Sequence, residues 1–198
     1  VSLSGDTALI GAADDDDNGA DSGSAYVFTR TGTTWTQQTK LLASDGSIND
    51  FFGGSVSLSA DTALIGAFCD DDHGAQSGSA YVFTRHGTIW SQQQKLLALD
   101  GAAFDYFGWS VSLSGDTALI GADGDTDNGT SSGSAYVFIR TGTTWAQQAK
   151  LLASDGAADD SFGWSVSLSG DTALIGAPYD NDNGDASGSA YVFIRTGT

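Results

Sequence analysis

Four short aspartate-rich segments share a residue pattern that could bind a divalent cation. The pattern reads D-x-D-[N/H]-G, and in its first copy Asp15 and Asp17 supply the carboxylates while Gly19 closes the turn. Alternating oxygen ligands in a flexible loop suit Ca²⁺, which takes about six to eight oxygens. The predicted calcium ligands in these segments are Asp15, Asp17, Asp70, Asp72, Asp125, Asp127, Asp180 and Asp182.

A second group of aspartates, in the links between repeated units, could complete the coordination of the ion. Its members, also predicted as ligands, are Asp50, Asp105 and Asp160. Two carboxylates per loop are few for a tight site, so we expect millimolar or sub-millimolar affinity, as in extracellular modules. The alternative is that Asp-Asn-Gly forms a turn with side-chain bonds to its own backbone, on a solvated surface. The sequence leaves both interpretations open.

The composition places nearly all of the negative charge in loops. The chain of 198 residues has a formal net charge of −18, and all 25 of its acidic residues are aspartates, which favour turns over helices. Such a surface attracts cations and repels nucleic acid and anionic membranes. No stretch approaches the length of a membrane span. We therefore expect Ca²⁺ as the cofactor, no nucleic-acid partner and no membrane insertion.

The elements that must position these aspartates repeat with a period of 55 residues. Each unit reads as four short strands, rich in β-branched and aromatic residues and separated by Gly, Ser, Asp and Thr. This organisation predicts an all-β fold, a β-propeller of four-stranded antiparallel blades, with a solenoid of stacked β-sheets as the alternative. The predicted repeats are 1–55, 56–110, 111–165 and the incomplete 166–198, within a single repeat domain of residues 1–198.

The strand topology predicts where the charge gathers. In an antiparallel meander, the loop after the second strand and the link after the fourth lie at the same end of the sheet. These segments contain 21 of the 25 aspartates. One end of the molecule should therefore be strongly acidic. The remaining aspartates, Asp6, Asp61, Asp116 and Asp171, should lie at the opposite end near Arg30, Arg85, Arg140 and Arg195.

Two tryptophans in the links, Trp109 and Trp164, are candidates for ligand binding. An exposed tryptophan beside aspartates can stack on a sugar ring while the carboxylates bond its hydroxyl groups. The alternative is that both side chains wedge between neighbouring blades. We expect no enzymatic activity, because near-identical blades offer no asymmetric carboxylate pair and the few arginines lie at the other end.

The repeated motifs resemble those of a known family. The links read FFGGS, YFGWS and SFGWS, and the second strands end in GAA, GAF, GAD and GAP. Together these resemble FG-GAP repeats, the blades of the integrin α-subunit propeller and of many bacterial cell-surface proteins. The resemblance covers the whole chain and implies a propeller, usually of seven blades, that is extracellular or at the cell surface and works in adhesion or binding.

Two departures limit what the resemblance implies. Only the fourth unit has GAP itself, at Gly176-Ala177-Pro178. The calcium loop that joins the first two strands of integrin blades is replaced here by SGDT or SADT, which is too short to wrap an ion. The family's metal ligands are therefore not transferred, and any metal site here would lie at the opposite end of the sheets.

These observations predict a secreted or cell-surface module that binds a protein or glycan ligand through an acidic, calcium-binding surface. The alternative is a structural subunit whose partners are copies of itself. In that case the last repeat, with three of the four expected strands, would present an open edge, and an unpaired edge is a template for another chain. Such a subunit would polymerise into an extracellular fibre or surface layer.

Overall fold

The structure is a computed structural model of the protein and describes residues 1–196. These residues form fifteen β-strands and no helix, so none of them belongs to a helix able to span a membrane. The strands are β1 (Ser2–Ser4), β2 (Thr7–Ala12), β3 (Ser24–Thr31), β4 (Thr34–Leu41), β5 (Ser55–Ser59), β6 (Thr62–Ala67), β7 (Ser79–His86), β8 (Ile89–Leu96), β9 (Ser110–Ser114), β10 (Thr117–Ala122), β11 (Ser134–Thr141), β12 (Thr144–Leu151), β13 (Ser165–Ser169), β14 (Thr172–Ala177) and β15 (Ser189–Ile194).

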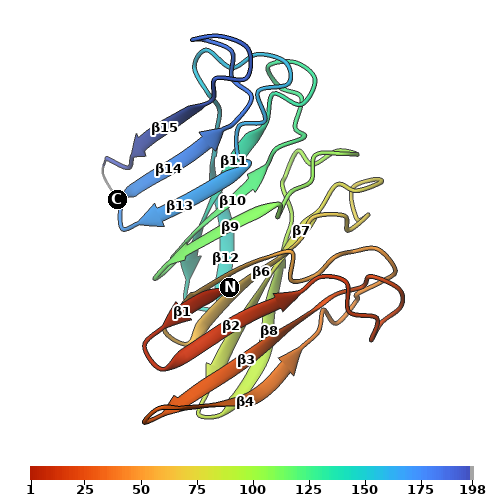
Figure 1. Ribbon diagram of the computed structural model, residues 1–198, viewed down its shortest axis with the longest axis vertical. Helices are drawn as coiled ribbons and strands as arrows, with labels where there is room; N and C mark the ends of the chain where they lie inside the picture. The colour runs from red at the N-terminus through yellow and green to blue at the C-terminus, as the bar shows by residue number, and fades with distance from the viewer. Residues whose placement is uncertain (197–198) are drawn as a thin grey trace.

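The strands form four antiparallel sheets that follow one another along the molecule (Figure 1). Within each sheet the strands lie in chain order, so β1 to β4, β5 to β8 and β9 to β12 form three meanders. The fourth sheet has the order β13-β14-β15 in the described residues. The first strands of successive sheets lie beside one another. The predicted all-β fold of repeated antiparallel sheets, with a shorter last sheet, is confirmed.

Each first strand enters the second through a two-residue turn that begins at a positive φ. Ser4 pairs with Thr7, which leaves Gly5 and Asp6 in the turn, and Gly5 has a φ of 56°. Glycine adopts this conformation without the steric penalty of a Cβ atom. The second repeat has Ala60 at this position, with a φ of 50°. The SGDT sequence is therefore explained by the geometry of the turn.

Neighbouring sheets pack face to face through two different apolar surfaces. One surface of each sheet, the leucine face, presents Leu9, Val27 and Leu41 in the first sheet. It packs against the aromatic face of the next sheet, which presents Ile65 and Tyr81 in the second sheet. The same pairing joins the second sheet to the third and the third to the fourth. The TALIGA strand contributes to both faces, because its adjacent Leu and Ile point to opposite sides of the sheet.

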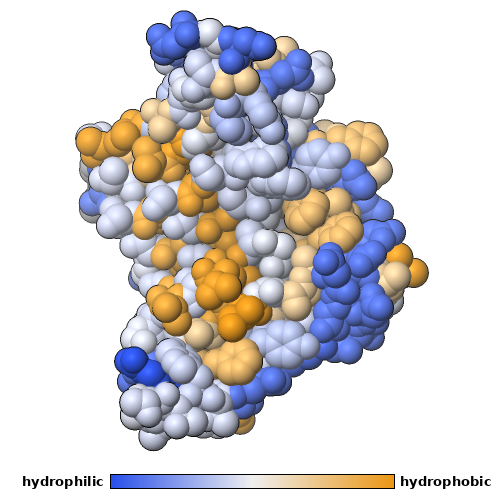
Figure 2. Space-filling model, in the orientation of Figure 1, coloured by the Kyte–Doolittle hydropathy of each residue, from blue (hydrophilic) through white to orange (hydrophobic). Residues whose placement is uncertain are grey.

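The first and last sheets each leave one of these faces uncovered. Ile10, on the aromatic face of the first sheet, is 36% exposed, whereas the equivalent Ile65 is fully buried. Leu174, on the leucine face of the last sheet, is 45% exposed, whereas the equivalent Leu119 is fully buried. Hydrophobic residues also gather on the surface where Figure 1 draws β1 (Figure 2). The molecule thus presents one free face of each kind.

The Phe-Gly pair in each link joins successive sheets at close backbone distance. Phe52 forms a parallel bridge with Gly23 and is fully buried in the apolar layer between the sheets. A Cβ atom on Gly11 would lie 1.8 Å from the carbonyl oxygen of Gly53, far inside contact distance. The recurrent glycines of the FG and GA motifs are therefore required by close backbone packing between sheets.

Candidate functional site

The aspartate-rich loops of the four repeats project toward one side of the molecule in Figure 1, and hydrophilic residues line much of that edge in Figure 2. We call this surface the acidic rim, formed by residues 13–22, 68–77, 123–132 and 178–187. At the opposite turns, aspartates and arginines form ion pairs as predicted. The pairs are Asp6–Arg30, Asp61–Arg85, Asp116–Arg140 and Asp171–Arg195.

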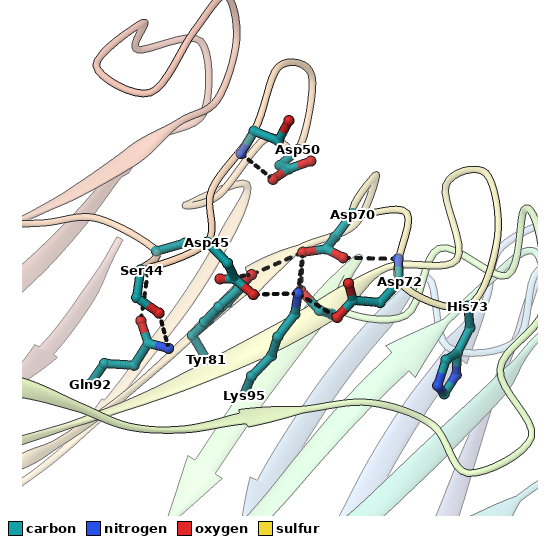
Figure 3. A network of polar contacts seen from close by, with 12 residues as sticks. Ser44, Asp45, Asp50, Asp70, Asp72, His73, Tyr81, Gln92 and Lys95 are labelled. Carbon is teal, nitrogen blue, oxygen red and sulfur yellow. Dashed lines mark hydrogen bonds and ion pairs between the residues drawn. The ribbon is translucent and has the colours of Figure 1, made fainter.

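In the second repeat, the two aspartates of the D-x-D pattern bind a lysine ammonium group (Figure 3). The Nζ atom of Lys95, on β8, lies 2.8 Å from Asp70 Oδ2 and 2.6 Å from Asp72 Oδ2. A third carboxylate, that of Asp45 in the preceding link, lies 2.9 Å from the same nitrogen. The ring centroid of Tyr81 is 5.3 Å from Nζ, within the range of a cation–π interaction. One ammonium group therefore neutralises part of a cluster of three carboxylates.

Asp70 is the buried member of this cluster, and both of its carboxylate oxygens accept hydrogen bonds. Oδ2 accepts the hydroxyl of Tyr81 at 2.9 Å and that of Ser79 at 3.1 Å, in addition to the ammonium of Lys95. Oδ1 accepts the backbone N–H of Asp72 at 3.2 Å. A buried charge is tolerated when it is paired and hydrogen-bonded in this way. The loop is thus held in place by a lysine from its own sheet.

The arrangement recurs in the first and third repeats, where Lys40 and Lys150 supply the ammonium groups. Burial opposes the ionisation of Lys95 and Lys150, but hydrogen bonds to the carboxylates outweigh it and raise the pKa of both lysines. Hydrogen bonding to Asp17 is the main reason that the pKa of Lys40 is raised. The surrounding carboxylates are Asp15 and Asp17 for Lys40, and Asp100, Asp125 and Asp127 for Lys150.

The fourth repeat presents the equivalent carboxylates, and no lysine of residues 1–196 contacts them. The hydroxyl oxygen of Tyr191 lies 2.7 Å from Asp180 Oδ2 and 2.9 Å from Asp155 Oδ1. The N–H of Asp182 donates to Asp180 Oδ1 at 2.9 Å. The charge of Asp180 is the main reason that the pKa of Asp182 is raised. The geometry of the loop is thus retained without the ammonium group that occupies its counterparts.

The second group of predicted ligands, Asp50, Asp105 and Asp160, bonds within the links. Asp50 accepts the N–H of Ser47 at 2.6 Å, Asp105 accepts that of Ala102 at 2.7 Å, and Asp160 bonds in the same way. All three are buried. Burial raises the pKa of Asp50 and of Asp105 to about 6, although the backbone N–H group favours the ionised form. Figure 3 shows Asp50 turned toward its own loop, apart from the contacts around Lys95.

The structure therefore gives the D-x-D pattern an internal cation in three of the four repeats. Among residues 1–196, no group of three or more His, Cys, Asp or Glu side chains is arranged to hold a metal ion. Three ligands that calcium would use are hydrogen-bonded to an ammonium group in the second and third repeats. Calcium binding remains a prediction, and in these repeats the ion would have to displace a lysine.

A row of aromatic rings, which we call the aromatic row, runs across the sheets and includes residues of the acidic rim. Phe51 stacks on Phe68 with 5.3 Å between ring centroids, and Phe68 lies 4.9 Å from Trp109. Trp109 lies 5.0 Å from Trp164, which in turn lies 5.7 Å from Tyr179. Trp164 is 38% exposed and Tyr179 is also exposed. The two tryptophans singled out in the sequence are therefore in contact, and both pack and face solvent in part.

A buried carboxylate without a full set of partners lies in the same region. Asp123 occupies the position in the third repeat that Phe68 occupies in the second. Its Oδ1 atom has no hydrogen-bond partner among the described residues, and burial raises its pKa to about 6. Burial and, to a smaller extent, the charges of Cys69 and Asp123 raise the pKa of Tyr106, whose ring lies 6.3 Å from Trp109.

Sequence reasoning missed the partners of the rim aspartates. The signal was present, because a lysine recurs in the QQxKLL segment of every fourth strand. The tryptophans that open these strands also have a specific partner. Trp90 donates its indole N–H to Gln38 of the preceding sheet at 2.9 Å, and Trp145 donates to Gln93 at 3.0 Å. The fourth strand thus contributes to two interfaces, one at each end.

The comparisons with known proteins agree with the architecture. A family model described as the FG-GAP repeat matches residues 1–28, 35–83, 90–138 and 145–193, which is most of the chain. Each full match begins in the fourth strand of one sheet and ends in the third strand of the next. A search of curated proteins found no match. The chain belongs to the FG-GAP repeat family.

Proposed function

We propose that this protein is an extracellular or cell-surface binding module, built as an arc of a β-propeller, which recognises a protein or glycan ligand through its aromatic row and acidic rim. Proteins with FG-GAP repeats are typically extracellular. The observation that carries the proposal is the contact series from Phe51 to Tyr179, which places partly exposed rings beside hydrogen-bonding carboxylates. Rings of this kind offer an apolar surface for stacking at the edge of a polar one.

A glycan array and a binding screen with cell-surface proteins test this proposal. Replacing Trp164 by alanine should abolish or weaken binding by at least about tenfold, as expected for an aromatic residue at the centre of an interface. Trp35→Ala is the matched control, because Trp35 is also exposed, at 41%, but belongs to the opposite end of the first sheet. Equal loss of binding in the two variants would contradict a ligand site at the aromatic row.

Calcium is part of this proposal as an ion that competes with the lysines for the rim loops. A metal that binds only the folded state raises the melting temperature. We expect millimolar calcium to stabilise Lys95→Met, in which the carboxylates of Asp45, Asp70 and Asp72 lose their cation, more than it stabilises the unmodified protein. No difference between calcium and chelator in either protein would remove the metal from the proposal.

Self-association is the second candidate function, favoured by the two uncovered faces. The free aromatic face of the first sheet and the free leucine face of the last are the two halves of the contact that joins each pair of internal sheets. A contact between two different surfaces of identical chains is head-to-tail, and it yields rings or filaments. We therefore propose that copies can stack end to end as a structural subunit.

Light scattering on two complementary variants tests this candidate. Ile10→Asp places a charge on the aromatic face, and Val192→Asp places one on the leucine face. Each variant alone should be monomeric, whereas a mixture should form one-to-one dimers, because one intact face of each kind remains. Ile89→Asp, at another exposed isoleucine, should assemble like the unmodified chain. A monomeric unmodified chain at micromolar concentration would rule this candidate out.

A further inference from the structure

We propose that the last sheet is an acceptor for an extended strand of a partner chain, and that this strand carries tryptophan, lysine five residues later and leucine directly after the lysine. The proposal deepens the second candidate function, on which it rests, by naming the chemistry of the partner. Four separate features of the last sheet support it, and each is the counterpart of a contact that is filled in the other sheets.

The first feature is the free edge of β15. In the complete sheets the third strand pairs along its whole length with the fourth, from Ala80↔Leu96 to His86↔Ile89 in the second sheet. Within the described residues, β15 pairs only with β14. A free edge of six residues offers backbone donors and acceptors to an added strand, which is the basis of recognition by strand addition.

The second feature is an apolar cleft of about 190 Å³ between the third and fourth sheets. Gln148, Phe193 and Arg195 contribute to its lining. In the equivalent place between the second and third sheets, Trp145 is buried, donates its indole N–H to Gln93, and lies under the guanidinium of Arg140. Gln148 and Arg195 are the counterparts of Gln93 and Arg140. The cleft is smaller than the roughly 300 Å³ at which small-molecule sites begin, and its lining fits one indole side chain.

The bulge in each fourth strand explains why this glutamine faces the cleft. In the third sheet, Val137 pairs with Ala149 and Phe138 with Gln147, so Gln148 is the extra residue of a β-bulge. Bulges redirect the side chain of the inserted residue. The equivalent Gln38 and Gln93 are bulged in the same way, and both accept an indole N–H from the next sheet. Gln148 is therefore positioned as the acceptor for a further tryptophan.

The third feature is the carboxylate cluster of Asp155, Asp180 and Asp182 beside Tyr191. Its counterparts around Lys95 and Lys150 each hold an ammonium group between three carboxylates and a tyrosine ring. The pairing register of β11 with β12 sets Tyr136 opposite Lys150. A strand added to β15 in that register brings its lysine opposite Tyr191, while its tryptophan falls opposite Arg195, as Trp145 falls opposite Arg140.

The fourth feature is a surface hollow that includes Trp164, Gly176 and Gly188. In the internal sheets the equivalent glycines approach the Phe-Gly backbone of the next link, so that a Cβ on Gly121 would lie 2.0 Å from the carbonyl oxygen of Gly163. A Cβ on Gly176 meets only Ser165. The donor segment that fits all four features is therefore a strand of the T-W-x-Q-Q-x-K-L-L type followed by a Phe-Gly link.

A synthetic peptide with the sequence of residues 144–165 tests the proposal against the intact 198-residue chain. Fluorescence anisotropy of the labelled peptide should show saturable binding with one peptide per chain, and amide exchange in β15 should slow. A Trp145→Ala or Lys150→Ala change in the peptide should weaken binding by about tenfold or more, as expected when a central anchor is removed from an interface. A scrambled peptide should not bind.

Two receptor variants make the test specific. Asp182→Asn removes a carboxylate that would receive the peptide's lysine and should weaken binding severalfold. Asp127→Asn is the same change in a cluster already filled by Lys150, and it should leave peptide affinity unchanged. Equal effects of the two variants, or equal binding of the scrambled peptide, would overturn the proposal. Oligomers of the chain without peptide binding would overturn it while leaving self-association intact, whereas peptide binding by a monomeric chain would support it alone.

Discussion

The ammonium group of Lys95 lies 2.8 Å from the buried carboxylate of Asp70, a residue that sequence reasoning assigned to calcium. Asp70 is only 4% exposed. Its charge is therefore removed from water and depends on the partner. An acidic loop that would repel itself when isolated is in this way held in a single conformation by a cation from the fourth strand of the same sheet.

Removing this lysine should be costly. Lys95→Met retains the length of the side chain but leaves Asp70 ionised and buried without its ammonium partner. Loss of one partner of a buried pair typically costs about 3–5 kcal/mol. Denaturant unfolding near neutral pH should show a loss of this size. Lys40→Met is the control, because Lys40 and Asp15 are more exposed, and a loss as large there would contradict the role of burial.

The turn between the first two strands offers a stabilising substitution. Ala60 has a φ of 50°, a conformation that costs an L-residue about 1–2 kcal/mol. Ala60→Gly should therefore raise the free energy of unfolding by about 1 kcal/mol. The matched reverse change is Gly115→Ala, at a φ of 57° with open space around the missing Cβ. It should destabilise by a similar amount, and equal stability of all three proteins would refute the strain.

The close approach of sheets should make one glycine far more sensitive than its counterpart. Gly121→Ala forces a Cβ atom to within 2.0 Å of the Gly163 carbonyl oxygen, whereas Gly176→Ala meets only the hydroxyl of Ser165 at 2.5 Å. We expect Gly121→Ala to cost more than about 3 kcal/mol, within the range of severe overpacking. Gly176→Ala should cost clearly less in the same thermal unfolding experiment.

The buried link aspartates should make stability depend on pH. Burial raises the pKa of Asp105 to about 6, while the N–H of Ala102 favours ionisation. The unfolded chain releases this proton near pH 4. Between these values the folded state binds more protons, so the free energy of unfolding falls as pH rises from about 4 to about 6.

Asp105→Asn should remove that part of the pH dependence. Its melting temperature should decline less than that of the unmodified protein between about pH 4.5 and about pH 7. Asp14→Asn, at an exposed aspartate, is the control and should follow the unmodified protein. The opposite trend acts at lower pH. Burial opposes ionisation of Asp45, but Lys95 lowers its pKa, so stability from this pair is lost as pH falls below about 4.

The fold could be predicted from the sequence because local and global signals agree. The 55-residue period, the Gly5 turn and the alternation in TALIGA each specify the same four-stranded unit, and the unit repeats without insertions. The candidate site was predicted less well. The pattern around Asp70 is compatible with calcium or ammonium, and the choice depends on Lys95, which is distant in sequence and reaches the loop only through pairing of β7 with β8.

The aromatic row was only partly predictable for a similar reason. Trp109 and Trp164 stood out as large residues in glycine-rich links, but Phe68 and Tyr179 lie at positions that vary freely between repeats. Their contact arises because the packing of successive sheets brings variable loop positions next to the links. Residues that differ between near-identical units therefore formed a continuous surface that no single unit's pattern contains.

The matched family segments, such as residues 35–83, straddle two sheets. Duplicating such a segment therefore inserts a pre-fitted joint, with one outer strand to complete the older sheet and three strands to begin a new one. Arrays of this kind can lengthen during evolution by simple copying, since no fresh surface has to be invented at each addition.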